Sequence, residues 1–304
     1  MKTYGDLNVH LIGIVMKGVV ERAISIIKRE CLRFTFKEKA TDYKSDKDYV
    51  TSADHAAQKI YVKLLRECFP TFGIIAEEDG LIIPCTENLF DAYFTIDPLD
   101  GTKAFMRRQS EGVGTMLGLI INGKVAASFI GDVMTEEIYC YRPESNKVHR
   151  ILELGKFEPG EVLSINPEKK LSEQFVLLRK APDSHSLFVQ QLTKKQNKGG
   201  LFKGINVMAG SVGITTAKLW KSEIGAVIWT PGITTSWDLT PVFGISEKLG
   251  FEFYSIEYDL LSFPYITQKN FVLKERKIKL ETETIIIHKS RVPELLKWIA
   301  RNYK

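Results

Sequence analysis

The feature that most constrains the fold is an apolar strand that runs directly into two carboxylates, in the segment FTIDPLDGTKAF (residues 94–105). The first residues of this segment favour a β-strand. Asp97 and Asp100 follow, with Pro98 between them. An Asp-Pro-x-Asp-Gly segment is also typical of an ordinary turn, since proline presets φ and aspartate hydrogen-bonds the nearby backbone. The segment therefore predicts either a turn after a buried strand or a strand end that carries chemistry.

Further acids stand at comparable places in the chain. Glu77 and Glu78 follow the short apolar strand GIIA, and Asp238 opens a helical segment after Trp237. In α/β proteins, ligands bind at the edge of a sheet where strands end and helices begin. Carboxylates gathered there would repel one another unless cations lay between them, and hard oxygen ligands suit Mg²⁺. These positions therefore favour a magnesium site over a simple turn.

The first half of the chain predicts helices followed by strands. An amphipathic helix is expected from residue 9 to about residue 32, and a polar loop over residues 39–49. Thr51 or Ser52 then caps a helix that ends near Phe69, with Asp54 in its first turn. A hairpin turning at Asn122-Gly123 is expected next, and strands dominate to about residue 150.

The second half alternates strands and helices, which predicts layered α and β elements. Strands are expected at residues 176–180, 226–230 and 283–289. Helices are expected at residues 184–195, at 211–225 with Gly225 closing the helix, at 238–250 with Gly250 past its end, and at 292–303. A domain boundary is expected near Glu158–Gly160.

Composition and charge exclude several classes of protein. The chain has 304 residues, 44% hydrophobic and 26% charged, which is ordinary for a globular protein of one large or two modest domains. Its net charge of +5 comes from scattered positive residues, which fit either a solvated surface or a field that favours anionic substrates. No basic stripe is interleaved with aromatic residues, so we expect no nucleic-acid polymer as a partner.

The apolar N-terminal segment does not predict a membrane anchor. It carries Lys17, Glu21 and Arg22, which neither a secretory signal nor a membrane span would hold. The four cysteines form no CxxC pair, and the five histidines show no metal-ligand spacing. We therefore expect reduced thiols, a cytoplasmic location, no membrane partner and no zinc site.

Four motifs together carry a resemblance to a known family. They are Asp48-x-Val50-Thr51-x-x-Asp54, Glu77-Glu78, Asp97-Pro98-Leu99-Asp100-Gly101-Thr102 and Trp237-Asp238. In order and spacing the chain resembles the inositol monophosphatase superfamily, whose members are Mg²⁺-dependent, lithium-sensitive phosphomonoesterases. The resemblance covers nearly the whole chain and extends to the closing strand and helix.

The resemblance implies an α/β fold, namely the αβαβα sandwich of the inositol monophosphatase and sugar phosphatase type. It implies an N-terminal α+β domain over residues 1–150 that carries most metal ligands. A C-terminal α/β domain over residues 151–304 would carry Asp238 and the residues that select the substrate.

The resemblance also implies the metal ligands and the catalytic residues. Glu77, Asp97 and the backbone carbonyl of Leu99 would bind one metal ion. Asp97, Asp100 and Asp238 would bind another, within a total of two or three Mg²⁺ ions. Thr102, helped by Glu77, would orient and activate the attacking water, and Asp54 would hold the water network of Thr102 or a further ion. A metal ion that lowers the pKa of water and stabilises the leaving oxygen suits this chemistry.

The implied phosphate- and substrate-binding residues are Gly101, Thr102, Lys103, Ser211 and Lys218. Backbone N–H groups at a helix start are suited to phosphate, and glycine lets the chain approach an anion closely. Lysines near a second phosphate make electrostatic sense, although a lysine on a solvated helix face would look the same in sequence.

The sequence after Gly101 favours one branch of the superfamily. Inositol monophosphatases proper usually have Gly-Thr-x-Asn-Phe, whereas GTKAF with Arg107 or Arg108 resembles the CysQ-like 3′(2′),5′-bisphosphate nucleotidases. Lys218 and the segment RKAPDSH (residues 179–185) resemble that branch too. The acidic residue with which inositol monophosphatases bind the inositol ring would fall near Pro231-Gly232, where this chain has no acid.

The expected activity is therefore that of a Mg²⁺-dependent phosphoric monoester hydrolase with a small phosphorylated metabolite as its partner. The resemblance favours 3′-phosphoadenosine 5′-phosphate, with AMP as product. A phosphatase for inositol phosphate or histidinol phosphate is the alternative enzyme. A regulator that binds phosphometabolites without turnover is the alternative from another class, because the glycine pairs usual after Trp-Asp are missing. The resemblance also allows a homodimer.

Overall fold

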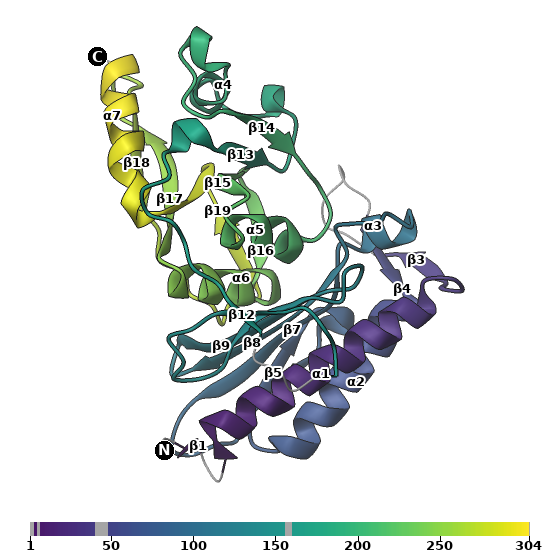
Figure 1. Ribbon diagram of the computed structural model, residues 1–304. Coiled ribbons are helices and arrows are strands. Elements are labelled where there is room, and N and C mark those ends of the chain that lie inside the picture. Colours follow the sequence, from purple (N-terminus) through teal and green to yellow (C-terminus); the bar gives the residue numbers. More distant parts are fainter. Residues whose placement is uncertain (1–2, 5–6, 40–47, 156–159, 304) are drawn as a thin grey trace.

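A computed structural model describes residues 3–4, 7–39, 48–155 and 160–303. These residues form five layers, in which two sheets alternate with three layers of helices (Figure 1). The helices are α1 (Val9–Glu30), α2 (Ser52–Cys68), α3 (Thr102–Met106), α4 (Leu187–Leu192), α5 (Val212–Trp220), α6 (Ser236–Lys248) and α7 (Val292–Asn302). The expected αβαβα sandwich is confirmed.

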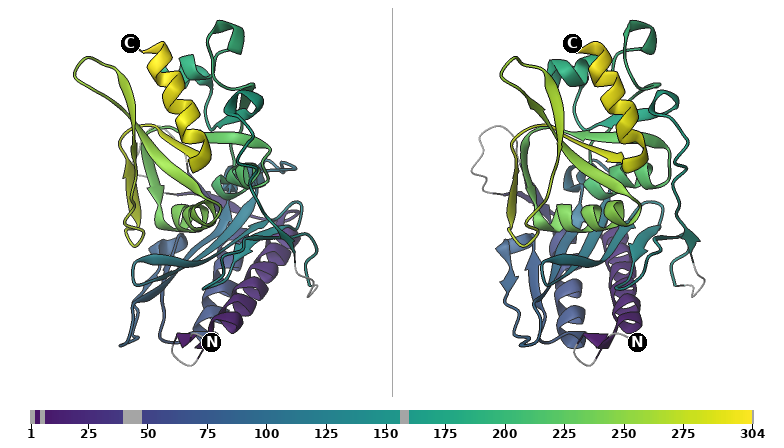
Figure 2. Two further views of the ribbon diagram at one scale, coloured as in Figure 1. Left: turned by 60° about the vertical axis from the view of Figure 1, so that its left-hand side comes forward. Right: turned by 90° about the vertical axis from the view of Figure 1, so that its left-hand side faces the viewer.

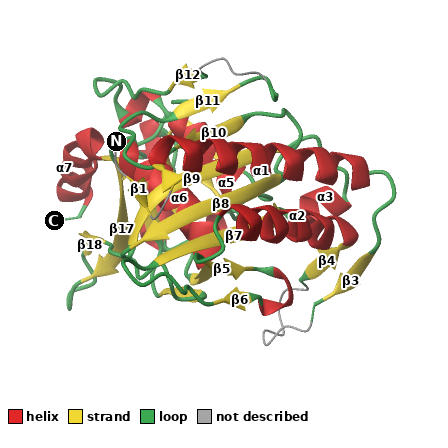
Figure 3. Ribbon diagram, turned by 90° about the horizontal axis from the view of Figure 1, so that it is seen from below, coloured by secondary structure: helices red, strands yellow, loops and turns green. Residues whose placement is uncertain are grey.

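The larger sheet has the strand order β12-β11-β10-β9-β8-β7-β5-β6 and is antiparallel except where β5 pairs with β7. Its strands are β5 (Gly73–Ala76), β6 (Ile82–Ile83), β7 (Ala92–Asp100), β8 (Gly114–Ile121), β9 (Lys124–Asp132), β10 (Ile138–Tyr141), β11 (His149–Ile151) and β12 (Glu161–Val162). Helices α1 and α2 lie side by side across its outer face (Figure 3).

The smaller sheet has the order β14-β13-β15-β20-β17-β18, with β13 parallel to both of its neighbours. Its strands are β13 (Phe175–Leu178), β14 (Gly204–Val207), β15 (Ile224–Trp229), β17 (Phe251–Tyr258), β18 (Pro264–Gln268) and β20 (Thr284–His288). Short pairs elsewhere are β1 (Thr3–Tyr4) with β2 (Leu7–Asn8), β3 (Phe36–Glu38) with β4 (Tyr49–Thr51), and β16 (Gly232–Thr235) with β19 (Lys277–Leu280).

Three of the four apolar cores in the described part of the chain hold the layers together. One joins α1 and α2 to the larger sheet, and one joins α4 and α7 to the outer face of the smaller sheet. The third contains α5 and α6, which lie between the two sheets, and its centre is the fully buried Trp220. Figure 2 shows this middle layer between the two sheets from the side. Helices α5 and α6 therefore connect the halves of the molecule, and the start of each faces the site described below.

Helix α2 begins as the sequence predicts. The Thr51 hydroxyl oxygen accepts the N–H groups of Ala53 and Asp54, and the Asp54 carboxylate accepts the Thr51 N–H at 2.8 Å. This reciprocal capping satisfies donors that a helix start leaves unpaired. It also fixes the buried Asp54 at the end of the helix that faces the site.

A bulge in β7 decides between the two structures predicted for the Asp97–Asp100 segment. Side chains three residues apart on a regular strand point to opposite faces. Here Asp97 pairs with Met116 and Asp100 with Gly114, so β7 has one residue more than β8 over this stretch. The extra residue shifts the alternation by one, and both carboxylates reach the same side. The segment is therefore a bulged strand end rather than a simple turn.

Most of the expected elements are present, and two expectations about the second half are wrong. The helix at 211–225 ends at Trp220, and Gly225 lies inside β15 instead of closing it. Ser222, at a φ of 60°, turns the chain before that strand. Strands β17, β18 and β19 had no counterpart among the expected elements.

The division at residue 150 stays a prediction, and β11 and β12 continue the larger sheet to Val162. Of the expected boundary, Glu158 and Pro159 lie outside the described residues, as do residues 40–47 of the expected polar loop. Within the described parts of the chain, every helix is too short or too polar to cross a membrane.

Candidate active site and metal centre

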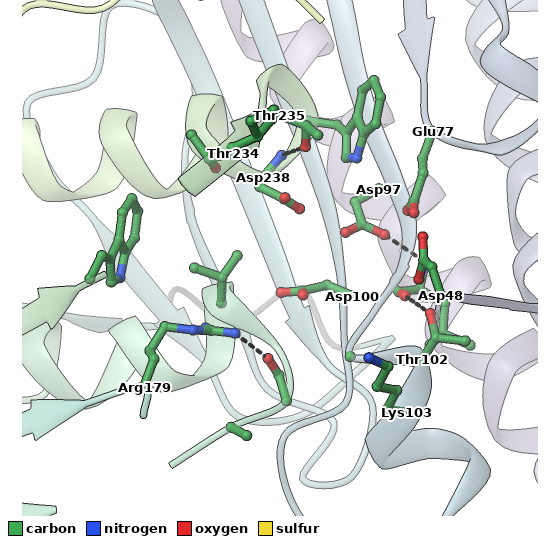
Figure 4. Close-up of a pocket in the computed structure, with 18 of the residues that line it drawn as sticks. Asp48, Glu77, Asp97, Asp100, Thr102, Lys103, Arg179, Thr234, Thr235 and Asp238 are labelled. Atoms are coloured by element: carbon green, nitrogen blue, oxygen red, sulfur yellow. Dashed lines mark hydrogen bonds between the residues drawn. The ribbon is translucent and has the colours of Figure 1, made fainter. Parts of the chain in front are cut away.

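Three carboxylates from two elements meet at the centre of a pocket (Figure 4). Asp97 and Asp100 come from the end of β7, and Asp238 comes from the first turn of α6. One oxygen of each lies within 4.8 Å of the others. Asp97 and Asp100 are only 3% and 7% exposed. Segments about 140 positions apart in sequence therefore converge as the motifs predict.

The electrostatics of this cluster fit a bound cation. Burial, together with the charges of Glu77, Asp100 and Asp238, raises the pKa of Asp97 well above its usual value. Burial and the neighbouring charges of Asp100 and Glu77 likewise raise the pKa of Asp238 to about 7. Buried like charges are costly without a counter-charge, and carboxylate oxygens are the ligands that Mg²⁺ prefers. The donor set therefore suits a divalent metal ion.

Asp100 is held in place by the start of α5. Its Oδ2 accepts the hydroxyl of Ser211 and, at 2.9 Å, the backbone N–H of Gly213. These bonds fix one carboxylate oxygen and leave the other for the pocket. Ser211 was expected to bind substrate, but it is fully buried and does not line the pocket among the described residues. Its observed role is to position Asp100.

Gly101 makes the sharp connection from β7 into α3. Its φ is +91°, and a Cβ there would lie 2.2 Å from the carbonyl oxygen of Gly112 and 2.7 Å from the backbone nitrogen of Ser211. Only glycine fits both the backbone conformation and the space. The turn brings Thr102 and Lys103 to the pocket wall.

Thr102 lies between Asp54 and the backbone of β7. Its hydroxyl is 3.3 Å from Asp54 Oδ1 and 3.2 Å from the carbonyl oxygen of Leu99. Burial, only partly offset by the hydrogen bonds from Thr51, raises the pKa of Asp54 to about 6. The Leu99 carbonyl also borders the pocket. The expected proximity of Thr102, Asp54 and Leu99 is therefore present.

Glu77 reaches the pocket but forms an ion pair that the sequence did not reveal. Lys39 Nζ lies 2.8 Å from Glu77 Oε1 and 2.9 Å from Glu78 Oε1. Burial lowers the pKa of Lys39, and the two glutamates outweigh that effect and raise it. Glu78 is also anchored through its backbone by the side chain of Gln58, at 2.9 and 3.0 Å. Among the described residues, the Thr102 hydroxyl contacts Asp54 and Leu99 rather than Glu77.

The pocket measures about 820 Å³ and is lined by both acidic and basic side chains. Its carboxylates are Asp48, Glu77, Asp97, Asp100 and Asp238, and its cations are Lys39, Lys103, Arg179, Lys180, Arg276 and Lys277. Arg179 faces the cluster, where its guanidinium donates to Thr215 Oγ1 at 3.1 Å and to the Gly210 carbonyl at 2.8 Å. Burial lowers the pKa of Arg179, partly offset by Asp100 and Asp238.

Lys218 does not join this group. It lies near the end of α5 and forms an ion pair with Glu223 at 3.5 Å. Among the described residues it is outside the pocket lining, so its expected contact with substrate is not supported. Spacing to a glycine suggested the assignment, but helix α5 presents its start to the site, and Lys218 lies near the other end.

The site residues that sequence reasoning missed are mostly basic. Lys39 precedes the Asp48 motif by nine positions, and Arg179 follows strand β13 directly. Arg276 and Lys277 lie in a stretch with no recognised motif. For Arg179, the position at a strand end was an available signal; for the other three, only the fold brings them near the acids.

Comparisons with known proteins assign the family. A family model, the inositol monophosphatase family, matches residues 11–287. The chain belongs to the inositol monophosphatase family.

Individual relatives are more distant. A curated relative, Nus factor SuhB of Xylella fastidiosa, is 32% identical over 96 residues, which cover 32% of this chain and 33% of that protein. The match therefore spans about a third of the length of such relatives.

Two solved structures share the fold at low identity. An IMPase/NADP phosphatase complexed with NADP and Ca²⁺ has a TM-score of 0.70 at 19% identity and covers 98% of each chain. An IMPase/NADP phosphatase complexed with Mg²⁺ and phosphate has a TM-score of 0.68 at 18% identity and covers 95% of each chain.

Proposed function

We propose that this protein is a Mg²⁺-dependent phosphomonoesterase that hydrolyses a small phosphorylated metabolite by attack of an activated water. Within that class, we favour a 3′(2′),5′-bisphosphate nucleotidase that converts 3′-phosphoadenosine 5′-phosphate to AMP. The observation that carries the proposal is the cluster of Asp97, Asp100 and Asp238, with oxygens within 4.8 Å of one another in an open pocket. No structural requirement of the fold explains why three acids, two of them buried, should face one another.

The carboxylates would hold the ions. Asp97, Asp100 and Asp238 supply one set of oxygens, and Glu77 with the Leu99 carbonyl supplies a second set next to it, shared through Asp97. When bound, the Mg²⁺ ions lower the pKa of water and stabilise the negative charge of the leaving oxygen. Lys39 would have to release Glu77 for that residue to act as a ligand.

Thr102 would orient the attacking water. A threonine hydroxyl has one proton to donate, and here that proton points to Asp54 or to the Leu99 carbonyl. Towards the pocket the Thr102 hydroxyl can therefore only accept a hydrogen bond. A water molecule that donates this hydrogen bond turns one of its own lone pairs towards the phosphorus. As the new P–O bond forms and the ester P–O bond breaks, the water proton passes through Thr102 to Asp54, and the leaving oxygen takes a proton from solvent. The pKa of Asp54, about 6, suits a proton acceptor near neutral pH.

A small anionic substrate fits the pocket better than a neutral one. Six basic side chains line it together with the acids. The IMPase/NADP phosphatase structures hold NADP or phosphate, which supports a phosphate ester, including a nucleotide, as the class of substrate. The position where inositol monophosphatases carry the ring-gripping acid has Pro231-Gly232, which disfavours inositol phosphate.

A regulator without turnover is the second candidate. Curated relatives carry the name Nus factor SuhB rather than the name of an enzyme. Against it stands the gathering of the proposed metal ligands and of Thr102 at one pocket, with Asp54 in contact with Thr102 behind it.

Release of inorganic phosphate tests the proposal. The purified protein is assayed with Mg²⁺ or EDTA against adenosine 3′,5′-bisphosphate, inositol 1-phosphate and histidinol phosphate. We expect Mg²⁺-dependent turnover with the first substrate fastest, and a loss of roughly 100-fold or more in Asp100→Asn and Asp238→Asn. The exposed Asp183 is the control, because Asp183→Asn makes the same chemical change at a residue outside the pocket lining. Activity in EDTA, or full activity in the two pocket variants, would contradict the mechanism; no turnover on any substrate would favour the regulator.

A further inference from the structure

Building on the proposed function, we propose that the β16–β19 ladder forms a second anion subsite in the same pocket, centred on Arg276. The subsite would hold a second phosphate of the substrate while the first is cleaved at the carboxylates. The substrate class is then a nucleoside that carries two phosphate groups at different positions.

The backbone places Arg276 beside the catalytic acids. Its carbonyl oxygen accepts the N–H of Ser236, the first residue of α6, at 3.3 Å. The ladder pairs Lys277 with Thr235, whose hydroxyl caps α6 by accepting the N–H of Asp238 at 3.4 Å. Arg276 and Lys277 therefore stand one helical turn from Asp238, on the pocket wall.

The guanidinium of Arg276 has two close neighbours. Its central carbon lies 5.5 Å from the centre of the Trp237 ring, a cation–π contact. Its terminal nitrogens also lie 3.1 Å from the position that a Cβ would take on Gly80. A guanidinium fixed in this way loses little conformational entropy when it binds an anion.

The guanidinium of Arg276 has no hydrogen-bond partner among the described residues. Its Nε–H is buried there without an acceptor, and the guanidinium forms no ion pair with any acid in the described part of the chain. Arg179, by contrast, donates hydrogen bonds to Thr215 and Gly210. An arginine fork without a carboxylate partner matches the geometry of a phosphate. We therefore assign the anion to Arg276 rather than to Arg179.

The surroundings of Arg276 suit the rest of a nucleotide. Lys180 and Lys277 lie on the same pocket and are both exposed, so they can reach a dianion from the rim. Trp229 and the half-exposed Ile233 add apolar surface to the lining. Basic side chains next to an apolar surface are suited to a phosphate attached to a sugar and base.

A neighbouring cavity offers a competing place for the second phosphate. It measures about 420 Å³ and shares Lys103 and Gly210 with the main pocket, and Arg107 and Met208 line its far part. Arg107 is exposed. Arg276 is the stronger candidate, because its guanidinium is held by Trp237 and Gly80.

The test compares two substrates that differ by one phosphate. Values of kcat/KM are measured for adenosine 3′,5′-bisphosphate and for adenosine 3′-monophosphate, and their ratio is the readout. We expect a ratio of about ten or more for the unmodified protein, and a fall of about tenfold in Arg276→Met. Lys277→Ala, at an exposed position, should lower the ratio by about threefold. Lys279→Ala is the matched control on the same strand, because Lys279 pairs with Glu281 outside the pocket lining, and its ratio should not change.

Three results would overturn the subsite. They are a ratio near one in the unmodified protein, an equal loss for both substrates in Arg276→Met, and a loss of preference in Arg107→Ala but not in Arg276→Met.

A fourth result separates the subsite from the proposed function. If neither substrate is hydrolysed, the proposed function fails, and calorimetric binding of adenosine 3′,5′-bisphosphate decides on the subsite alone. Binding about tenfold weaker in Arg276→Met than in the unmodified protein supports the subsite. Equal binding, or none in either protein, overturns it.

Discussion

Replacing Asp238 with asparagine is expected to stabilise the metal-free protein at alkaline pH. Burial and the charges of Asp100 and Glu77 raise the pKa of Asp238 from 3.8 to about 7. A carboxyl group whose pKa rises on folding stabilises the folded state fully at pH values below the pKa that it has in the unfolded chain. This stabilisation is lost as the pH rises through the pKa that the group has in the folded protein. Above about pH 7, the metal-free protein therefore carries the whole cost of the ionised Asp238.

The size of this cost follows from the pKa shift. A rise of about three units corresponds to about 4 kcal/mol, at about 1.36 kcal/mol per unit. The carboxyl borders an open pocket, so solvent screening reduces the cost to about 2–4 kcal/mol. For a chain of 304 residues, the typical entropy of unfolding per residue converts this into a rise in Tm of about 3–6 °C.

Scanning calorimetry in EDTA at about pH 5 and about pH 8 measures the effect. Asp238→Asn should melt above the unmodified protein at the higher pH, with a smaller difference at the lower pH. Excess Mg²⁺ should raise the Tm of the unmodified protein more than that of the variant, because binding to the folded state stabilises it. The control Asp183→Asn should follow the unmodified protein throughout. A variant that melts at or below the unmodified protein at the higher pH in EDTA would refute the reasoning.

Three further changes test other parts of the site and fold. Thr102→Ala should lower kcat for phosphate release by about 100-fold while Thr102→Ser keeps most of it, because only the hydroxyl orients the water; equal rates in both would exclude that role. Gly101→Ala should cost at least about 2 kcal/mol in denaturant unfolding, since a Cβ there meets the Gly112 carbonyl at 2.2 Å and φ is +91°; an unchanged midpoint would contradict the close approach. Trp220→Ala should cost about 3–5 kcal/mol in the same assay, because the side chain is fully buried between the two sheets; a loss below about 1 kcal/mol would show that the middle layer repacks.

Local patterns were enough to predict the elements that begin or end with distinctive residues. The cap at Thr51, the hairpin turn at Asn122-Gly123 and the glycine after α6 each carry a signal within a few positions. The prediction of a helix up to Gly225 was wrong because the deciding contacts are distant in sequence. That glycine lies in a strand because β13 and β20 pair on either side of it, and no nearby residue records such pairing.

The acids of the site were easier to predict than its bases. Asp97, Asp100 and Asp238 sit in motifs of fixed spacing, since one strand end and one helix start must hold them rigidly. Lys39 and Arg276 reach the pocket from segments that carry no comparable pattern. Their positions depend on how loops and a two-stranded ladder cross the site, which is a property of the whole fold.

The connectivity of the smaller sheet sets the order of events during synthesis. Helix α6, which carries Asp238, packs on a sheet whose interior strand β20 follows it in the chain. At the usual speed of translation, roughly 10–40 s separate the appearance of Asp100 from that of β20. During this interval a nascent chain gains Asp238, the third acid of the cluster, before it has the strand that completes the sheet behind α6. A chain that stops between Asp238 and β20 would hold all three acids without that sheet, and we expect it to bind the proposed ion more weakly than the folded protein.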